Sequence, residues 1–296
     1  MKALVTGGAG FIGSNLVDFL IEKGFEVTVI DNESSNSGQF YWNSKAKNYK
    51  LDIRDYKNTK ILYEGIELVF HLAAETRIQA SIINPIDTIS INTLGTCVVL
   101  QCSRESNVKR LIFSSTSAIY GNNPVPNNEA QIDDCLNPYS TSKLNGELLC
   151  KLYSKEYGLN TIVLRYFNVY GDRQPTKGSY TPVVGVFMTQ KSLNKPLTIV
   201  GDGHRRRDYV HVSDVVNANF LAATVEVGTK DIGSVFNVGC GKNYSVNEVA
   251  KLISAEIEYI ADRVGEANST LASIEKIYTI LGWTPKVTLL DWLKTF

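Results

Sequence analysis

The sequence contains few of the residues that characterise disulfide-rich or metal-binding proteins. Its 296 residues include five cysteines, three histidines and two methionines. The cysteines are scattered, with no C-x-x-C pair and no histidine at metal-ligand spacing, so we expect reduced thiols and no metal site. No apolar run is long enough to cross a bilayer, and the first residues lead directly into a strand. We therefore expect a cytoplasmic protein without a targeting segment.

The chain also lacks an excess of either charge. Thirty basic residues balance thirty acidic ones, so the formal net charge is zero. This balance excludes a general attraction to nucleic acid or to an anionic membrane, but it is compatible with a local basic site for a phosphate group. Hydrophobic residues make up 44% of the chain and charged residues 20%, as in ordinary globular proteins. We expect a small-molecule partner, no nucleic acid and no membrane.

The sequence does contain a regular alternation of short apolar segments and longer helical ones. The candidate strands are residues 3–6, 26–30, 68–71, 110–114 and 161–165. Helical patterns separate them, for example at 14–23, 91–106 and 140–157. Short apolar strands joined by helices indicate a parallel sheet covered on both faces. We therefore predict an α/β fold with a doubly wound, Rossmann-type parallel sheet, whose ligands bind beyond the carboxyl ends of the strands.

The alternation breaks after about residue 166, which indicates a second and smaller part. We expect residues 1–165 to form a dinucleotide-binding domain, joined by a returning segment near 209–238 with a last strand at 235–238. Residues 166–208 and 239–296 would form an interleaved α/β substrate-binding cap domain, with helices at 183–191 and 246–258. The two parts would then enclose a cleft.

A glycine-rich turn, GGAGFIG at residues 7–13, follows the first strand. Glycine at these places allows a tight turn, a close approach to a pyrophosphate and close packing of the next helix. The second strand ends at Asp31, whose carboxylate can accept hydrogen bonds from a ribose and would repel a 2′-phosphate. This pattern favours NAD over NADP. Asp52 and Ile53, after the third strand, are candidates for contact with adenine, or are ordinary loop residues.

Tyr139 and Lys143 are four residues apart, so they share one face of a helix. An ammonium group near a phenol favours the phenolate, so we expect a lowered tyrosine pKa and a role as general base. Y-x-x-x-K also occurs on solvated helix faces. A hydroxyl-rich run, SSTS at residues 114–117, follows the strand at 110–114 and would emerge at the same sheet edge. Its hydroxyls could share a substrate proton or cap a helix.

These motifs resemble those of the extended short-chain dehydrogenase/reductases, and within them the nucleotide-sugar epimerases related to UDP-glucose 4-epimerase. The resemblance covers nearly the whole chain. It rests on motifs that occur in the family's order: residues 7–13, 31–32, 52–53, 71–74 (HLAA), 92, 114–121 (SSTSAIYG), 138–139, 143, 164–171 (LRYFNVYG), 201–203, 207–214 (RDYVHVSD), 263–266 and 281–285.

The resemblance implies an enzyme with tightly bound NAD that epimerises a UDP-hexose at C4. It would oxidise C4, let the 4-keto sugar rotate and return the hydride to the other face. The implied catalytic residues are Tyr139 as base, Lys143 as its partner and Thr116. The implied substrate-binding residues are Thr116, Tyr139, Asn168, Arg207 and Arg263. The implied cofactor-binding residues are Gly7, Gly10, Phe11, Ile12, Gly13, Asp31, Asn32, Asp52, Ile53, Leu72, Ala73, Ala74, Asn92, Ser114, Tyr139, Lys143 and Tyr166.

The hydroxyl-rich run also helps to choose the reaction. The run resembles that of the related 4,6-dehydratases, which carry Asp-Glu where this chain has Ser117 and Ala118, and that of the UDP-glucuronate decarboxylases, which carry Ser-Glu there. Without an acid there, dehydration and decarboxylation are disfavoured. The alternatives are an NAD(H)-dependent reductase or dehydrogenase of a 4-keto nucleotide sugar, and a non-catalytic NAD sensor.

Three further features follow from the resemblance. Thr270 falls where relatives control access for the sugar's 2-substituent, and its small size implies room for N-acetylhexosamines. The helices near 95–106 and 143–157 resemble those that pair in family homodimers, so we expect a homodimer. The chain departs from the family in lacking an aspartate near 272–273 and in a shortened loop at 33–39.

Overall fold

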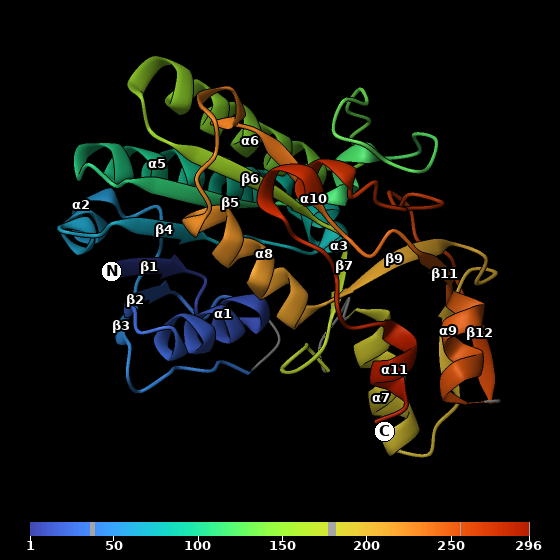
Figure 1. Cartoon of the computed structure of the whole chain (residues 1–296). Helices are drawn as coiled ribbons and strands as arrows, with labels where there is room; N and C mark the ends of the chain where they lie inside the picture. Colours follow the sequence, from blue (N-terminus) through green and yellow to red (C-terminus); the bar gives the residue numbers. More distant parts are fainter. Residues whose placement is uncertain (36–38, 177–181, 255, 296) are drawn as a thin grey trace.

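The computed structural model describes residues 1–35, 39–176, 182–254 and 256–295. Within these residues the largest sheet has seven strands, all parallel, in the order β10-β6-β5-β4-β1-β2-β3 (Figure 1). They are β1 (Lys2–Thr6), β2 (Glu26–Asp31), β3 (Lys47–Lys50), β4 (Leu68–His71), β5 (Arg110–Thr116), β6 (Thr161–Tyr166) and β10 (Val235–Val238). The chain starts near the middle, builds one half and then the other. This confirms the predicted doubly wound sheet.

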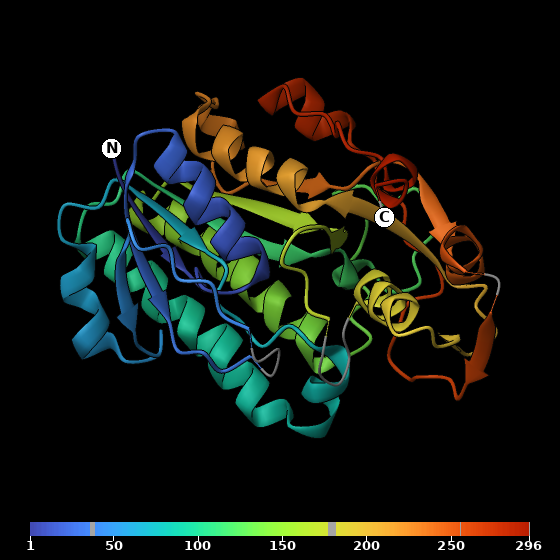
Figure 2. The ribbon, with the colours of Figure 1, turned by 90° about the horizontal axis from the view of Figure 1, so that it is seen from below.

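Two layers of helices cover the two faces of this sheet (Figure 2). The helices that pack in pairs are α1 (Phe11–Glu22) with α8 (Val212–Thr224), and α5 (Gly95–Glu105) with α6 (Pro138–Tyr157). Successive residues of β1 point to opposite layers, because Ala3 and Val5 are buried with α1 and α8 while Leu4 is buried with α5. Both faces of the sheet are therefore apolar, as a parallel sheet requires.

Helix α6 begins at Pro138 because the residues around it complete a capping box. The side chain of Asn137 accepts the N–H of Ser140 at 2.8 Å, and Ser140 Oγ accepts the N–H of Asn137 at 3.4 Å. Proline is favoured at the first helical position, since its missing N–H would have no partner there. Tyr139 consequently lies in the first turn of a 20-residue helix, close to where β5 ends.

Before α5, and once after β5, the chain forms short helical segments between the longer elements. These are α2 (Tyr56–Thr59), η1 (Lys60–Tyr63), α3 (Ile78–Ile83), α4 (Pro85–Ile89), the π-turn η2 (Ser90–Leu94) and, after β5, η3 (Ser117–Tyr120). The helix predicted at 91–106 therefore starts as a π-turn. Segments of this kind occur often at functional sites.

The smaller part of the molecule is built from segments far apart in the sequence (Figure 1). Its strands are β7 (Asn168–Tyr170), β9 (Arg206–His211) and β11 (Asn243–Ser245) in one sheet, and β8 (Leu197–Val200) and β12 (Ile257–Ile260) in another. Its helices are α7 (Val183–Ser192), α9 (Val246–Ile253) and α11 (Leu289–Leu293). Two further helical segments lie against the main sheet: η4 (Thr229–Asp231) leads into β10, and α10 (Glu275–Leu281) packs on β10. A separate apolar cluster includes Phe187, Val249 and Leu289. Strand β10 lies beside β6 and α8 packs on α1, so the chain returns to the main sheet between these cap segments.

Two expectations about local structure need correction. The helix predicted at 246–258 ends at Ile253, and Ile257–Ile260 instead form β12, which pairs in parallel with β8. Tertiary pairing overrides the helical pattern there, because the edge of β8 offers backbone partners. The run at 114–116 belongs to β5, which extends to Thr116, so these hydroxyls are fixed within a strand. Among the described residues, no helix is long and apolar enough to cross a membrane.

Candidate active site

A cavity of about 790 Å³ lies at the carboxyl edge of the main sheet and is lined by residues of both parts of the chain. The residues predicted from the sequence to bind cofactor or substrate line it, with two exceptions. Gly13 packs against the backbone of Gly7, and Asn92 is 2% exposed behind the wall. The structure therefore brings the other predicted residues together around one cavity, while these two lie behind its wall.

The glycine turn after β1 requires glycine at two positions. Gly7 has a φ of 71°, and a Cβ there would lie 2.7 Å from Ala73 N. A Cβ at Gly13 would lie 2.0 Å from Gly7 O, so the start of α1 packs directly on the turn. Gly10 is the N-cap of α1 and brings no capping side chain, so the N–H groups of the first turn can donate to a phosphate.

Asp31 ends β2 beside this turn and lines the cavity. Its Oδ2 accepts the N–H of Ala9 at 3.1 Å, and its Oδ1 accepts the N–H of Glu33 at 2.8 Å. Burial raises the pKa of Asp31, while these backbone donors oppose the rise. The carboxylate is thus oriented at the place where a dinucleotide-binding fold holds the adenosine ribose.

Asp52 also lines the cavity, but its carboxylate already has partners. Arg54 donates to it from Nε at 3.0 Å and from Nη2 at 2.7 Å, and Asn32 donates at 3.2 Å. The Arg54 guanidinium lowers the pKa of Asp52. An adenine that bound Asp52 would therefore compete with Arg54 for its carboxylate oxygens. Ile53 offers apolar surface to the adenine ring instead. In the neighbouring shortened loop, residues 36–38 lie outside the described residues.

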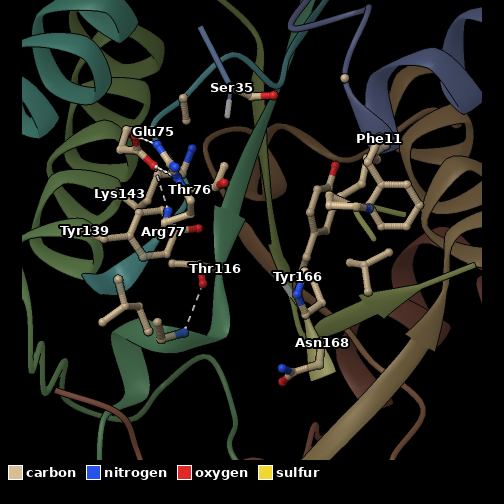
Figure 3. Close-up of a pocket in the computed structure, with 18 of the residues that line it drawn as sticks. Phe11, Ser35, Glu75, Thr76, Arg77, Thr116, Tyr139, Lys143, Tyr166 and Asn168 are labelled. Atoms are coloured by element: carbon tan, nitrogen blue, oxygen red, sulfur yellow. Dashed lines mark hydrogen bonds and ion pairs between the residues drawn. The ribbon is translucent and has the colours of Figure 1, made fainter. Parts of the chain in front are cut away.

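The three residues expected to act on the sugar share one side of the cavity, across from Phe11 and Tyr166 (Figure 3). Thr116 ends β5, and its Oγ1 accepts the N–H of Ala118 at 3.1 Å. Tyr139 is fixed by its backbone, whose N–H donates to Ser81 Oγ at 3.1 Å. Lys143 is 4% exposed, and its Nζ lies 4.4 Å from the centroid of the Phe113 ring. Strand β5 and helix α6 thus bring the three side chains together.

The electrostatics of this group differ from the expectation of a lowered tyrosine pKa. Burial raises the pKa of Tyr139, a hydrogen bond with Thr116 lowers it, and the charge of Glu75 raises it. Burial also lowers the pKa of Lys143 to about 8. Desolvation outweighs the attraction that the spacing suggested, so in the protein alone the phenol stays protonated. A nearby positive charge would be needed to favour the phenolate.

Glu75 and Arg77, which belong to no motif recognised in the sequence, follow β4 and line the cavity close to Lys143 (Figure 3). Arg77 binds Glu75 through Nε–Oε1 at 2.8 Å and Nη2–Oε2 at 2.6 Å, and both side chains are about four-fifths buried. A signal for them is present in the sequence, because Glu75 directly follows the HLAA motif and Arg77 comes two residues later, at the carboxyl end of a strand where α/β sheets place their ligands. The pair adds a carboxylate close to Tyr139.

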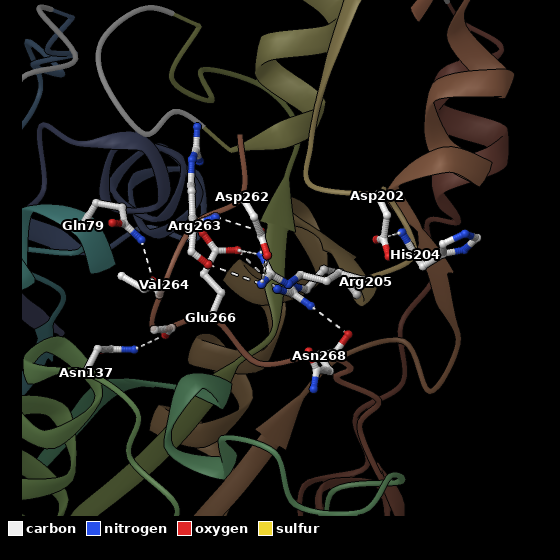
Figure 4. Close-up of polar contacts among 12 residues, drawn as sticks. Gln79, Asn137, Asp202, His204, Arg205, Asp262, Arg263, Val264, Glu266 and Asn268 are labelled. Carbon is white, nitrogen blue, oxygen red and sulfur yellow. Dashed lines mark hydrogen bonds and ion pairs between the residues drawn. The ribbon is translucent and has the colours of Figure 1, made fainter. Parts of the chain in front are cut away.

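The other end of the cavity is basic. Arg207 in β9 is 13% exposed; its Nη2 lies 3.4 Å from Glu266 Oε2 and its Nη1 donates to Arg206 O at 3.0 Å. Burial lowers the pKa of Arg207, and the charge of Glu266 opposes this. Arg205 and Arg263 line the same end, where Arg205 pairs with Asp262 at 2.7 Å (Figure 4). Clustered guanidinium groups of this kind suit the oxygens of a diphosphate.

The loop that carries Arg263 is bound to both parts of the molecule. Gln79 donates to Val264 O at 2.8 Å, and Asn137, the N-cap of α6, donates to Gly265 O at 2.9 Å (Figure 4). The basic end of the cavity is thus held in a fixed relation to the helix that carries Tyr139.

Two smaller polar residues line the cavity wall contributed by the cap. Asn168 begins β7 and faces the cavity near Tyr166 (Figure 3). Thr270 is 5% exposed, and its Oγ1 accepts the N–H of Asp208 at 3.4 Å. A threonine here occupies less of the cavity than an aromatic residue would.

NAD fits the side of this cavity that Gly7, Gly10 and Asp31 form. The tight turn offers backbone donors for a pyrophosphate, and Asp31 offers an acceptor for a ribose. Leu72, Ala73 and Ala74 continue this wall toward Lys143 and Tyr139. When bound, NAD supplies a hydride acceptor at the end where these two residues lie.

Comparison with known proteins identifies the class. The model of the NAD dependent epimerase/dehydratase family matches residues 3–239, and the chain belongs to this family. NAD is therefore its cofactor, and the family membership supports an enzyme.

Individual relatives narrow this class. The chain is similar to a UDP-glucose 4-epimerase from Thermotoga maritima whose crystal structure contains UDP-glucose. The two sequences are 39% identical, the structures superpose with a TM-score of 0.93, and the match covers 99% of this chain and 96% of that one. It is 36% identical over 313 residues to a UDP-glucose 4-epimerase of Halalkalibacterium halodurans, covering 97% and 91% of the two chains. The UDP-glucuronic acid 4-epimerase of Bacillus cereus, in complex with UDP-glucuronic acid and NAD, is 30% identical with a TM-score of 0.90, covering 99% and 97%.

Proposed function

We propose that this protein interconverts UDP-glucose and UDP-galactose by 4-epimerisation and keeps its NAD bound through each turnover. In this proposal Tyr139 takes the proton of the C4 hydroxyl and later returns it. The Thr116 hydroxyl shares that proton. Lys143, one turn after Tyr139 on helix α6, orients the Tyr139 phenol. The 4-keto sugar rotates within the cavity, and C4 is then reduced on its other face.

The observation that carries this proposal is the wall formed by Thr116, Tyr139 and Lys143, next to which Ser117 and Ala118 line the cavity. A hydroxyl and a methyl at these two positions cannot protonate a leaving group. The charge of Glu75 acts on Tyr139, and Arg77 engages both oxygens of this carboxylate. Glu75 therefore acts as a hydrogen-bond acceptor, which favours oxidation and reversal over dehydration.

The basic end of the cavity would hold the rest of the substrate. Arg207 and Arg263 would bind the diphosphate and its nucleoside, and Asn168 would donate to a phosphate or sugar oxygen. Fixing the diphosphate while leaving the sugar loosely held allows the sugar to turn about its phosphate link.

We propose further that N-acetylhexosamines are accepted as well as hexoses. Thr270 is small and lines the cavity, so a sugar with a bulky group at C2 has room. The structures of two relatives contain UDP-glucose and UDP-glucuronic acid, so the family cavity accepts sugars with different substituents.

The hydride path distinguishes this proposal from a reductase of a 4-keto sugar. UDP-galactose deuterated at C4 would be incubated with the protein in ordinary water, and the product would be analysed by mass spectrometry. Epimerisation with a hydride that is stored and returned gives UDP-glucose that keeps the deuterium. Transfer of the label to free NADH with formation of the 4-keto sugar would favour the reductase or dehydrogenase, which runs its reaction backwards on UDP-galactose.

We also propose a homodimer in the cytoplasm. The exposed apolar side chains on and beside helix α6 support the dimer, because Leu148 is 58% exposed, Leu152 45% and Leu94 53%. The five cysteines are all free thiols, as is usual in a reducing compartment. Light scattering after size-exclusion chromatography would show a mass of about twice 32.8 kDa if this surface pairs two copies.

A further inference from the structure

A buried ion pair lies behind the wall that carries the three catalytic side chains. Arg165 in β6 donates to Glu147 in α6 through Nε–Oε1 at 2.9 Å and Nη2–Oε2 at 2.7 Å. The side chains of Glu147 and Arg165 are 6% and 4% exposed. Neither residue lines the cavity, so neither one touches the substrate.

This pair is connected to the catalytic wall from two directions. Ser115, which precedes Thr116 in β5, donates its hydroxyl to Glu147 Oε1 at 2.5 Å. On α6, Glu147 follows Lys143 by four residues and therefore lies on the same helix face, one turn further along. Between them, Gly146 packs against the Phe113 ring, so the helix lies close to β5 at this level. Glu147 thus joins the strand of Thr116 to the helix of Lys143.

The pair is costly for stability alone. Burying two charges removes them from water, and apolar residues of similar size often serve stability as well or better. Arg165 Nη1 is moreover buried without a hydrogen-bond partner among the described residues. A second acceptor, Asp133, receives Nη2 at 3.1 Å but is itself 37% exposed. The arrangement therefore needs a reason beyond packing.

We propose that Glu147 is a positioning residue for the reaction, which holds Thr116 and Lys143 in register and keeps Lys143 in its ammonium form. This inference rests on the proposed roles of Tyr139 and Lys143. Loss of the Glu147 carboxylate would let β5 and α6 shift relative to each other and would make Lys143 easier to deprotonate.

The groups that face Lys143 show why Glu147 matters for its charge. Burial lowers the pKa of Lys143 to about 8, and Cys150 and Glu147 oppose this. Burial strongly raises the pKa of the Cys150 thiol, so the thiol is neutral at working pH. His71 in β4 has a pKa lowered to about 3 by burial and is neutral too. Tyr139 is also neutral in the protein alone, while β5 presents the uncharged Phe113 ring. On the cavity side Glu75 also lies close to Lys143, but both of its oxygens are engaged by Arg77 (Figure 3). On the side of the sheet the carboxylate near Lys143 is Glu147, which is partly offset by Arg165.

The test measures the pKa of Lys143 directly in the protein without added substrate. Slow acetylation by acetic anhydride at a series of pH values, with peptide mass spectrometry, gives the fraction of free amine at Lys143. We expect Glu147→Gln to lower this pKa by about one unit, a tenfold change in the ratio of amine to ammonium. Glu156→Gln is the matched control, because Glu156 lies on the same helix but is 50% exposed and pairs with Lys155.

Turnover provides the second readout. The alkaline limb of the kcat profile should move to lower pH in Glu147→Gln with KM nearly unchanged, since Glu147 touches no substrate. Ser115→Ala, which removes the link but keeps the charge, should lower kcat about tenfold and leave the alkaline limb in place. Where Glu147→Gln fails to fold, the double variant Glu147→Gln/Arg165→Gln removes both charges and retains a neutral hydrogen-bonded pair; its Lys143 pKa should still fall.

The outcomes separate this inference from the proposed function. An unchanged Lys143 pKa in a folded Glu147→Gln or double variant would overturn the inference, even if the wild-type protein epimerises. A kcat profile of Glu147→Gln that matches that of Glu156→Gln would overturn it as well. Wild-type protein without any turnover of UDP-sugars would instead contradict the proposed function, and the acetylation result would then show whether Glu147 still sets the charge of Lys143.

Discussion

Asn92 holds the backbone of Glu75 at both of its polar groups. Its Oδ1 accepts the N–H of Glu75 at 2.8 Å, and its Nδ2 donates to the C=O of Glu75 at 2.9 Å. The same Nδ2 also donates to Ser142 Oγ on α6 at 2.8 Å. One buried amide therefore fixes the loop of Glu75 and Arg77 against the helix of Tyr139 and Lys143.

Replacing this amide should loosen the catalytic wall. Asn92→Ala would leave the Glu75 N–H and C=O buried without partners, at a cost of about 1–3 kcal/mol for each unmade bond. We expect a lower unfolding temperature and a fall in kcat, measured by calorimetry and by steady-state kinetics. Asn48→Ala on the exposed edge strand β3 should change neither. Equal stability and activity of both variants would show that the Asn92 contacts are dispensable.

Removing the phenol should stop the reaction without removing the cofactor. Tyr139→Phe keeps the ring that fills this part of the wall but has no group to accept the C4 hydroxyl proton. We expect kcat to fall by a factor of about 10²–10⁴, the usual contribution of a general base. The NAD content of the purified variant, measured after denaturation, should match that of the wild type. Turnover at the wild-type rate would remove Tyr139 from the role of base.

Neutralising Glu75 should change the pH at which turnover is lost. The negative charge of Glu75 raises the pKa of Tyr139, so removing it lowers that pKa. In Glu75→Gln the acid limb of the kcat profile is therefore expected to move to lower pH. The positive charge of Arg77, no longer neutralised by Glu75, also lowers the Tyr139 pKa and shifts the limb in the same direction. Glu129→Gln is a suitable control outside the cavity lining. A limb that stays in place or moves to higher pH would contradict this electrostatic account.

Enlarging Thr270 should narrow the range of sugars. Thr270→Tyr places an aromatic ring in the cavity wall, and we expect the kcat/KM for UDP-N-acetylgalactosamine to fall by at least about tenfold relative to that for UDP-galactose. Competition between the two substrates in one tube measures this ratio directly. An unchanged ratio would place the 2-substituent elsewhere in the cavity.

Burial of His71 predicts a specific loss of stability in acid. Its ring is 1% exposed, with Nδ1 2.7 Å from Thr6 Oγ1 and Nε2 2.9 Å from Thr96 Oγ1, and burial lowers its pKa to about 3. Below pH 6.5 the His71 ring binds a proton in the unfolded chain but not in the folded protein. The free energy of unfolding therefore has its full value above pH 6.5 and decreases as the pH falls toward 3. Urea unfolding should show a loss of about 1 kcal/mol per pH unit in this window. The slope should be shallower in His71→Gln; equal slopes would contradict the assignment.

The parts of the site that follow the regular alternation of strands and helices could be predicted from the sequence. The apolar runs that became β1, β4 and β5 alternate with helical patterns, and each site motif follows one of these strands. Strand order in such a sheet brings their carboxyl ends to one edge, so Gly7, Thr116 and Tyr139 were expected to meet there. Asp31 was expected for the same reason.

What the sequence did not show depends on three-dimensional packing. Strand β3 consists of the exposed polar residues Lys47–Lys50, which carry no apolar pattern and pair only because β2 offers an edge. The direction of the Tyr139 pKa depends on burial, which spacing alone does not report. The Glu147–Arg165 pair joins residues 18 positions apart. The family resemblance assigns Asn92 to the cofactor, whereas the structure shows its amide bonded to Glu75 and Ser142, partners that a sequence motif does not reveal.

The central claim is that the chain epimerises a UDP-hexose at C4 with NAD that it already holds. Incubating the purified protein with UDP-galactose, without added cofactor, and following the anomeric signals by NMR tests this claim directly. The account predicts that the signal of UDP-glucose appears and grows to a constant ratio. No conversion of UDP-galactose, either as purified or after addition of NAD⁺, would contradict it.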